Sequence, residues 1–244
     1  MHQTIKRPLS SLMSLGAVLL SLRLRLYIVA VDEKNLLISG HWLSALIWGI
    51  AALCLVFAAL AAIRTKEAGS ISITGPVAAL GEGLVAGLLL LSMLAMAEPV
   101  SLLEKARNAV GYLTSVCLLV GAYRRAVGKS AFFGIYCALC LFFALYLVNV
   151  YRVWSSNPQL MDYFFPLLAC IALTLLSYQN AALSLGIGSR RLWLASGLLT
   201  ICFGIGAVYG SESMLLYIGG AVWALTNLLG ADAASRNRYE ERER

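Results

Sequence analysis

Long apolar stretches alternate with short polar ones along the whole chain. A helix that crosses the hydrocarbon core of a bilayer needs about 20 mostly apolar residues, with a range of about 17–25. Eight stretches reach or approach this length, and they predict membrane-spanning helices over residues 9–31, 42–63, 75–97, 108–123, 130–151, 163–185, 192–209 and 214–230. The fourth stretch is the shortest, and its helix can begin earlier, near Ser101. The pattern therefore predicts an all-α, polytopic integral membrane protein with eight transmembrane helices.

The composition supports the same class of protein. Of the 244 residues, 60% are hydrophobic and only 13% are charged, whereas soluble domains are about 45–50% apolar and about 25% charged. A soluble protein of this size needs more polar surface than these charges supply. Disorder is excluded by the same figures, because disordered chains are poor in aliphatic residues and rich in charge. The expected surroundings of the chain are therefore a lipid bilayer.

The net charge of +7 reflects where the basic residues lie. One predicted side of the membrane holds thirteen of them: Lys6, Arg7, Arg64, Lys66, Arg124, Arg125, Lys129, Arg190, Arg191, Arg236, Arg238, Arg242 and Arg244. The other side holds only four: Lys34, Lys105, Arg107 and Arg152. The positive-inside rule then predicts a multi-pass protein of the cell membrane with both termini in the cytoplasm. Because the charges are scattered between apolar runs, no nucleic-acid partner is expected.

Two pairs of short stretches recur along the chain. Residues 26–31 share four of six identities with residues 145–150, and residues 109–114 share four of six with residues 221–226. This pattern fits a parallel tandem repeat of two four-helix halves, residues 1–128 and 129–230, followed by a charged cytoplasmic tail over residues 231–244. Chance matches between leucine-rich stretches are an equally good explanation. If the repeat is real, the interface between the halves is the natural place for a site.

Glu82 is the only carboxylate inside a predicted span, where it is flanked by Gly81 and Gly83. An ionised carboxylate is costly in lipid, so we expect it to face the bundle interior, to pair with a cation or to remain protonated. The flanking glycines, with Gly83 and Gly87 in a small-xxx-small pattern, predict that a neighbouring helix approaches closely there. A structural ion pair and a role in ligand binding are both open for this carboxylate.

Arg23 and Arg25 are the other two charges inside predicted spans, and so they are the expected partners of Glu82. Two residues along a helix correspond to about 200° of rotation, so these side chains do not share a face. Arg25 is expected to snorkel to the headgroups, whereas Arg23 lies deeper. An inward Arg23 would bind a carboxylate or phosphate bidentately. The alternative is that both side chains snorkel.

A second group of polar residues lies in the inner halves of the sixth and eighth spans: Ser177, Tyr178, Gln179, Asn180, Thr226 and Asn227. Such side chains commonly hydrogen-bond between helices and hold a bundle together. With Glu82, they could instead line a cavity that faces the cytoplasm. The candidate ligand-binding residues are therefore Glu82, Arg23, Gln179, Asn180 and Asn227.

No catalytic residue, metal site or cofactor is expected. Cys137 and Cys140 form a C-x-x-C, but all six cysteines lie inside spans, where a free cysteine behaves as a small hydrophobe. His41 shares a loop with Asp32 and Glu33, a spacing too loose to predict a metal site. The chain has no phosphate-binding loop, zinc-protease, serine-hydrolase or dinucleotide-binding motif. The sequence thus predicts a protein that is not an enzyme.

Three functions remain open at this stage. The first is the binding or transport of a small anionic or amphipathic solute through the bundle, for which a homodimer would enlarge a small path. The second is a membrane sensor or accessory subunit, whose partner is another membrane protein. The third, an intramembrane enzyme that acts on lipid, normally needs more than one buried acid or histidine.

Overall fold

The computed structural model describes residues 2–29, 42–65, 75–95, 101–154, 160–209 and 213–243. Within these ranges the chain forms eight α-helices and no strand: α1 (His2–Val29), α2 (Trp42–Arg64), α3 (Pro76–Ala95), α4 (Leu102–Ala126), α5 (Phe133–Trp154), α6 (Leu160–Ser184), α7 (Arg190–Ala207) and α8 (Met214–Glu243). The predicted spans coincide with these helices one for one, so the all-α fold is confirmed.

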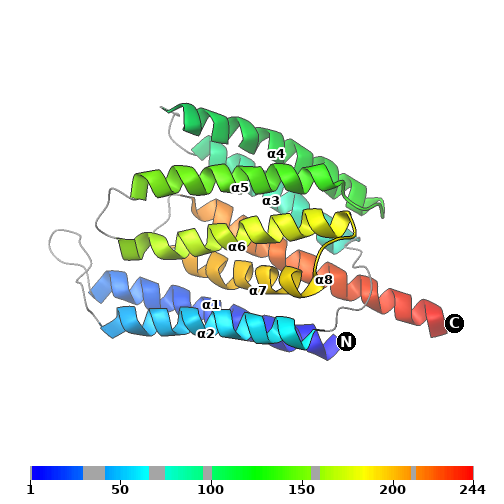
Figure 1. Ribbon diagram of the computed structural model, residues 1–244, viewed down its shortest axis with the longest axis horizontal. Coiled ribbons are helices and arrows are strands. Elements are labelled where there is room, and N and C mark those ends of the chain that lie inside the picture. The colour runs from blue at the N-terminus through cyan, green and yellow to red at the C-terminus, as the bar shows by residue number, and fades with distance from the viewer. Residues whose placement is uncertain are drawn as a thin grey trace.

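Successive helices run in opposite directions along one bundle (Figure 1). Because their number is even within the described chain, α1 begins and α8 ends at the same end of the bundle. The connections over residues 127–132 and 185–189 lie at that end as well, and we call it the turn end.

Six of the described helices, α1, α2, α3, α5, α6 and α8, are long and apolar enough to cross a membrane. The other two helices, α4 and α7, are less apolar, and the cause differs between them. In α4 the charges lie at the ends, where Ser101 and Glu104 form a capping box and Arg124 and Arg125 occupy the last turn. In contrast, α7 packs against α1, α2, α6 and α8, so protein rather than lipid covers most of its surface.

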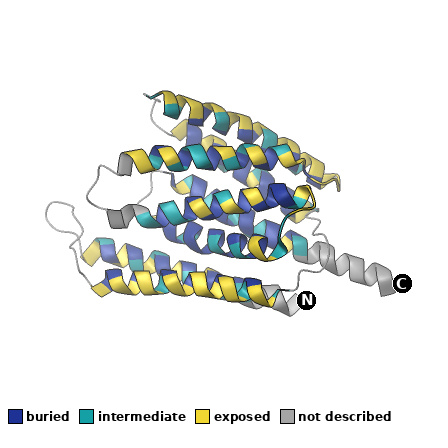
Figure 2. Ribbon diagram, in the orientation of Figure 1, coloured by how far each residue is buried: buried dark blue, intermediate teal, exposed yellow. Residues whose placement is uncertain are grey.

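The outer helices expose much of their surface (Figure 2), and many of the exposed residues are large and apolar. In α2 the buried face is built mostly from small residues, among them Ala51, Cys54, Ala58 and Ala62. The opposite face exposes large ones, including Leu53, Val56, Phe57 and Leu60. Without a hydrophobic effect between helices in lipid, small residues mark the surfaces where helices meet. Side-chain size, rather than polarity, therefore distinguishes the two faces of this helix.

The first four helices do not form one packed unit. Among the described residues α2 and α3 make no contact; α1 and α2 pack against α7, while α3 packs against α4 and α8. The internal repeat inferred from the short recurring stretches remains a prediction. The predicted charged tail, residues 231–244, is helical and forms part of α8 as far as Glu243.

The closest approach between α3 and α8 lies at Gly81. A Cβ atom placed there would lie only 1.7 Å from Oγ1 of Thr226, and a Cβ at Gly230 would lie 3.1 Å from Cβ of Ala78. The expected close approach is thus right for Gly81 and wrong for Gly83 and Gly87: a Cβ at Gly83 would have its nearest neighbour at 3.9 Å, and one at Gly87 nothing within 4 Å. Gly81 therefore faces α8, while the adjacent Glu82 faces α4.

Candidate ligand-binding site

Glu82 lies in the second turn of α3, which begins with a proline at its first helical position. Its side chain is completely buried, as the cost of a carboxylate in lipid required. The carboxylate forms an ion pair with Arg125, whose Nε lies 3.0 Å from Oε2 of Glu82. The expected partners Arg23 and Arg25 were therefore wrong for Glu82, although the expectation of an interior pair with a cation was right.

Arg125 is a member of this candidate site that the sequence reasoning did not single out. It was placed among the basic residues at the membrane surface, but its side chain is only 2% exposed. The helix α4 runs to Ala126, three residues beyond the predicted span, and carries Arg125 on the same face as Leu118 and Gly121. This three- or four-residue spacing was the available signal, because it continues the buried face of α4 through the last turn.

Gly121 makes room for the pair. A Cβ on Gly121 would lie 3.1 Å from Oε1 and 3.2 Å from Cδ of Glu82, so the absence of a side chain allows the carboxyl group to rest against α4. Arg125 follows one turn later and reaches the same carboxyl group. Arg124, the next residue back, is exposed and donates from Nε to the carbonyl oxygen of Ser130 at 3.2 Å.

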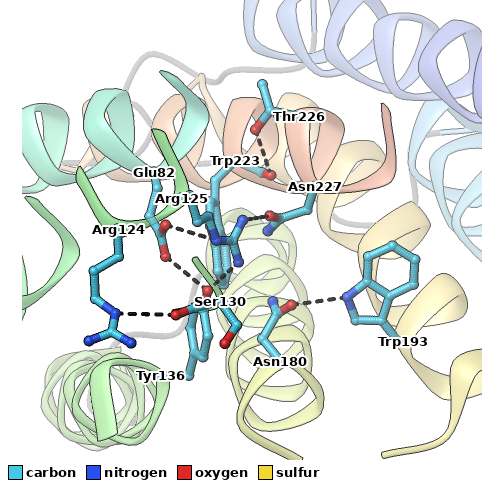
Figure 3. A network of polar contacts seen from close by, with 10 residues as sticks. All are labelled: Glu82, Arg124, Arg125, Ser130, Tyr136, Asn180, Trp193, Trp223, Thr226 and Asn227. Atoms are coloured by element: carbon cyan, nitrogen blue, oxygen red, sulfur yellow. Dashed lines mark hydrogen bonds and ion pairs between the residues drawn. The ribbon is translucent and has the colours of Figure 1, made fainter. Parts of the chain in front are cut away.

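Two further side chains complete the Glu82 network, defined here as Glu82, Arg125, Tyr136 and Asn227 (Figure 3). Nη1 of Arg125 donates to Oδ1 of Asn227 in α8 at 2.8 Å. Nη2 donates to the hydroxyl of Tyr136 in the first turn of α5. That hydroxyl donates in turn to Oε1 of Glu82 at 3.0 Å. Four helices therefore meet at one ion pair near the turn end.

Three buried hydrogen-bond donors near this network have no partner among the described residues: Nδ2 of Asn180, Nε1 of Trp223 and Nδ2 of Asn227. The orientation of the two asparagine amides follows from their hydrogen-bond partners. Asn227 accepts from Arg125 through Oδ1, and Asn180 accepts from Nε1 of Trp193 at 3.1 Å. Because guanidinium and indole groups only donate, the amide oxygens must face them, and each NH2 group points elsewhere.

Two of these donors, on Trp223 and Asn227, adjoin the ion pair. The Trp223 ring stacks on that of Tyr136 with 6.4 Å between centroids, which places the indole beside the network. Figure 3 shows Trp223 and Asn227 of α8 beside Arg125, and Asn180 of α6 between this group and Trp193 of α7. An unpaired buried donor costs about 1–3 kcal/mol. Most buried polar groups in proteins are hydrogen-bonded, so several unpaired donors in one place point to a binding site.

The structure thus joins two of the five predicted site residues, Glu82 and Asn227, through Arg125, whereas Asn180 is bonded to Trp193. Gln179 is buried as well, and its Oε1 has no partner among the described residues. It precedes Asn180 on α6 and so points about 100° away from it around the helix. The amide of Gln179 is not part of the Glu82 network.

Arg23 is buried at a different place in the bundle. Its Nη1 donates to the carbonyl oxygen of Gly206 at 2.6 Å, and its Cζ lies 5.2 Å from the centre of the Phe165 ring. Gly206 is the penultimate residue of α7, so its carbonyl is among the last four, which lack an intrahelical donor. Arg25 is exposed, in agreement with the prediction that the two side chains occupy different faces.

Within the described ranges, no three His, Cys, Asp or Glu side chains gather as metal ligands. The loop residues Asp32, Glu33 and His41 lie outside those ranges. The cysteines of the C-x-x-C are Cys137, which is exposed, and Cys140, which is half-buried on the same helix.

The chain matches no protein-family model, no curated protein and no solved structure. Its class follows from the fold and from the apolar helices: it is a polytopic, helical, multi-pass membrane protein. What distinguishes it within that class is a buried Glu82–Arg125 ion pair, surrounded by uncharged hydrogen-bonding side chains.

Proposed function

We propose that this membrane protein binds a small anionic solute at the Glu82 network and carries it through the helix bundle. The observation behind this proposal is the set of unpaired buried donors, on Asn227 and Trp223 next to the Arg125 network and on Asn180 of α6. The donors and the cation together favour a ligand that supplies acceptor oxygens and negative charge, such as a carboxylate or a phosphate.

The position of this site also supports a ligand rather than a purely structural role. Sites in helix bundles are typically built between helices from a few polar groups in an apolar surrounding. A buried ion pair contributes little to stability, because the loss of hydration offsets the attraction between the charges. Ionisable residues inside a membrane protein commonly mark a path for a substrate or an ion.

Anion binding can be tested with the purified protein in detergent. Thermal unfolding would be followed with inorganic phosphate, acetate, benzoate or succinate, and with choline and glycerol as a cation and a neutral solute. A bound ligand raises stability by RT ln(1 + [L]/Kd), so at least one anion is expected to raise the melting temperature. Stabilisation by choline or glycerol alone would contradict the proposal. Uptake of the stabilising anion into proteoliposomes then tests transport.

Two substitutions connect the effect to the site. Trp223→Phe removes the unpaired Nε1–H but keeps an aromatic ring against Tyr136, and we expect it to weaken anion binding about tenfold. Ser92→Ala is the matched control, because Oγ of Ser92 is also buried without a partner among the described residues. Ser92 lies ten residues from Glu82 on α3, roughly 15 Å away at a ~1.5 Å rise per residue. Equal effects of both substitutions would disprove the assignment of the site.

A further inference from the structure

We infer that the anion replaces Glu82 as the partner of Arg125, and that Glu82 then takes up one proton, so that solute and proton bind together. This inference rests on the proposed function, and it adds the ion to which solute binding is coupled. It follows from the charges that surround the carboxylate.

The groups that face Glu82 supply a single positive charge. From α4, Arg125 forms the ion pair, and Gly121 adds no side chain. From α5 the hydroxyl of Tyr136 donates a hydrogen bond, and it is the only other titratable group in contact with the carboxylate among the described residues. On α8 the neighbouring side chains are uncharged: Asn227 is bonded to Arg125, and Figure 3 also draws Trp223 and Thr226 nearby.

Every nitrogen of the Arg125 guanidinium already has a partner, and these contacts use three of its five N–H groups. Its Nε faces Glu82, its Nη1 donates to Asn227 and its Nη2 donates to Tyr136. Bidentate binding of a carboxylate or phosphate requires two adjacent donors of the guanidinium fork. At the Nε edge Glu82 must move away before a solute can bind, so a solute that binds there competes with Glu82 for the positive charge of Arg125.

Displacement would leave Glu82 as a buried carboxylate without a counter-charge, which is the state that burial disfavours most. Protonation removes that charge. The balanced step is A⁻ + H⁺ + (Glu82 carboxylate, Arg125⁺) → (A⁻, Arg125⁺) + Glu82 carboxylic acid. One O–H bond forms, nothing is oxidised or reduced, and the site is neutral before and after. The new acid group can donate a hydrogen bond to Tyr136, whose hydroxyl already lies 3.0 Å from Oε1.

The consequence for transport is a defined stoichiometry. A monoanion would cross together with one proton, so the net movement of charge would be zero. Binding would also depend on pH. Because each anion binds together with one proton from solution, the apparent Kd rises about tenfold for each unit by which the pH rises. Without Glu82 the dependence disappears, because no proton is then required.

The test is a proton count by titration calorimetry, using whichever of phosphate, acetate, benzoate or succinate stabilises the protein. Each titration is run at one pH in two buffers with different enthalpies of ionisation, which reveals the protons taken up per anion. The wild-type protein is expected to take up about one proton per monoanion. E82Q is expected to take up none, and its Kd should not change with pH. Glu104→Gln is the matched control, since glutamine preserves the capping box at the start of α4.

The outcomes separate the two proposals. Anion binding by the wild-type protein without proton uptake overturns the coupling and leaves the proposed function standing. Proton uptake that persists in E82Q also overturns it, because another group then supplies the proton site. If none of the four anions binds to either protein at any pH, the proposed function itself fails. The number of protons that the wild-type protein takes up is measured without any substitution, so it tests the coupling even if E82Q does not fold.

Discussion

Arg125, in the last turn of α4, lies 3.0 Å from the carboxylate of Glu82 in α3, and both side chains are buried. Through Tyr136 and Asn227 the same pair reaches α5 and α8. A single charge pair therefore links four helices at the turn end of the bundle. The loss of stability on substitution should therefore depend on whether one charge of the pair is removed or both.

Loss of one member of the pair is expected to be costly. Glu82→Met leaves the Arg125 guanidinium buried without a counter-charge, and such changes typically cost about 3–5 kcal/mol. The double variant Glu82→Met with Arg125→Met removes both charges, and we expect it to recover most of the stability, since apolar replacements of buried pairs are often neutral. Unfolding in detergent by heat or denaturant measures the difference.

Arg124→Met provides the control for that series. Arg124 is exposed and adjacent to Arg125, so its replacement should change stability by no more than about 0.5 kcal/mol. If the double variant is as unstable as Glu82→Met alone, the two residues do not act as a pair.

Gly81→Ala is expected to force α3 and α8 apart. The added Cβ would lie 1.7 Å from Oγ1 of Thr226, whose hydroxyl is held by the carbonyl oxygens of Val222 and Trp223 at 3.0 Å each. Overpacking of this kind costs about 1–3 kcal/mol, and here it should also weaken anion binding, because Glu82 is the next residue. Thermal unfolding and the anion titration are the two measurements.

Gly87→Ala is the matched substitution on the same helix, since nothing lies within 4 Å of its added Cβ. Alanine is the better helix former, so this variant should be as stable as the wild type or slightly more so. Thr226→Gly in the Gly81→Ala background should restore part of the lost stability. Equal stability of the Gly81→Ala and Gly87→Ala variants would refute the close contact.

Arg23→Met should destabilise the bundle, whereas Arg25→Met should not. The first substitution leaves the carbonyl oxygen of Gly206 without the donor that now lies 2.6 Å away, near the end of α7. A hydrogen bond from a charged group contributes about 1.5–3 kcal/mol. Arg25 is exposed, so its loss should fall within about 0.5 kcal/mol. Comparable losses from both changes, measured by unfolding in detergent, would argue against the contact with Gly206.

The eight-helix bundle predicts where reporter fusions will lie. Fusions at residues 129, 188 and 244 should report one side of the membrane, since the first two follow directly from the turn end and the last follows α8. Fusions in the connections from α3 to α4 and from α5 to α6 should report the other side. The positive-inside rule predicts that the first side is the cytoplasm. If residue 129 reports the same side as the α3–α4 connection, α4 does not cross.

The membrane-spanning helices were predictable because their cause is local. A bilayer of fixed thickness requires about 20 apolar residues in succession, and that count is visible in the chain. The cost of a buried carboxylate was equally general, so the interior position of Glu82 and its need for a cation followed without any knowledge of the packing. The identity of that cation did not follow, because Arg125 lies where a short span was expected to have ended.

Gly81 shows the same division between what is local and what is not. Three glycines, at positions 81, 83 and 87, were visible in the sequence, but the contact depends on how α3 is rotated against α8. Hydrophobic periodicity cannot report that rotation in a membrane helix, because lipid and protein core both favour apolar side chains. In α2, for example, the face toward lipid and the face toward the bundle are both apolar.

The sequence by itself thus determined the class of protein, the number of its helices and the residue whose charge had to be compensated. Only the tertiary structure decided which arginine compensates it, which glycine lies between helices and which amides surround the pair. The physical reason is that the bilayer acts on each segment separately. The contacts of Glu82, in contrast, depend on the rotation and depth of four helices at once.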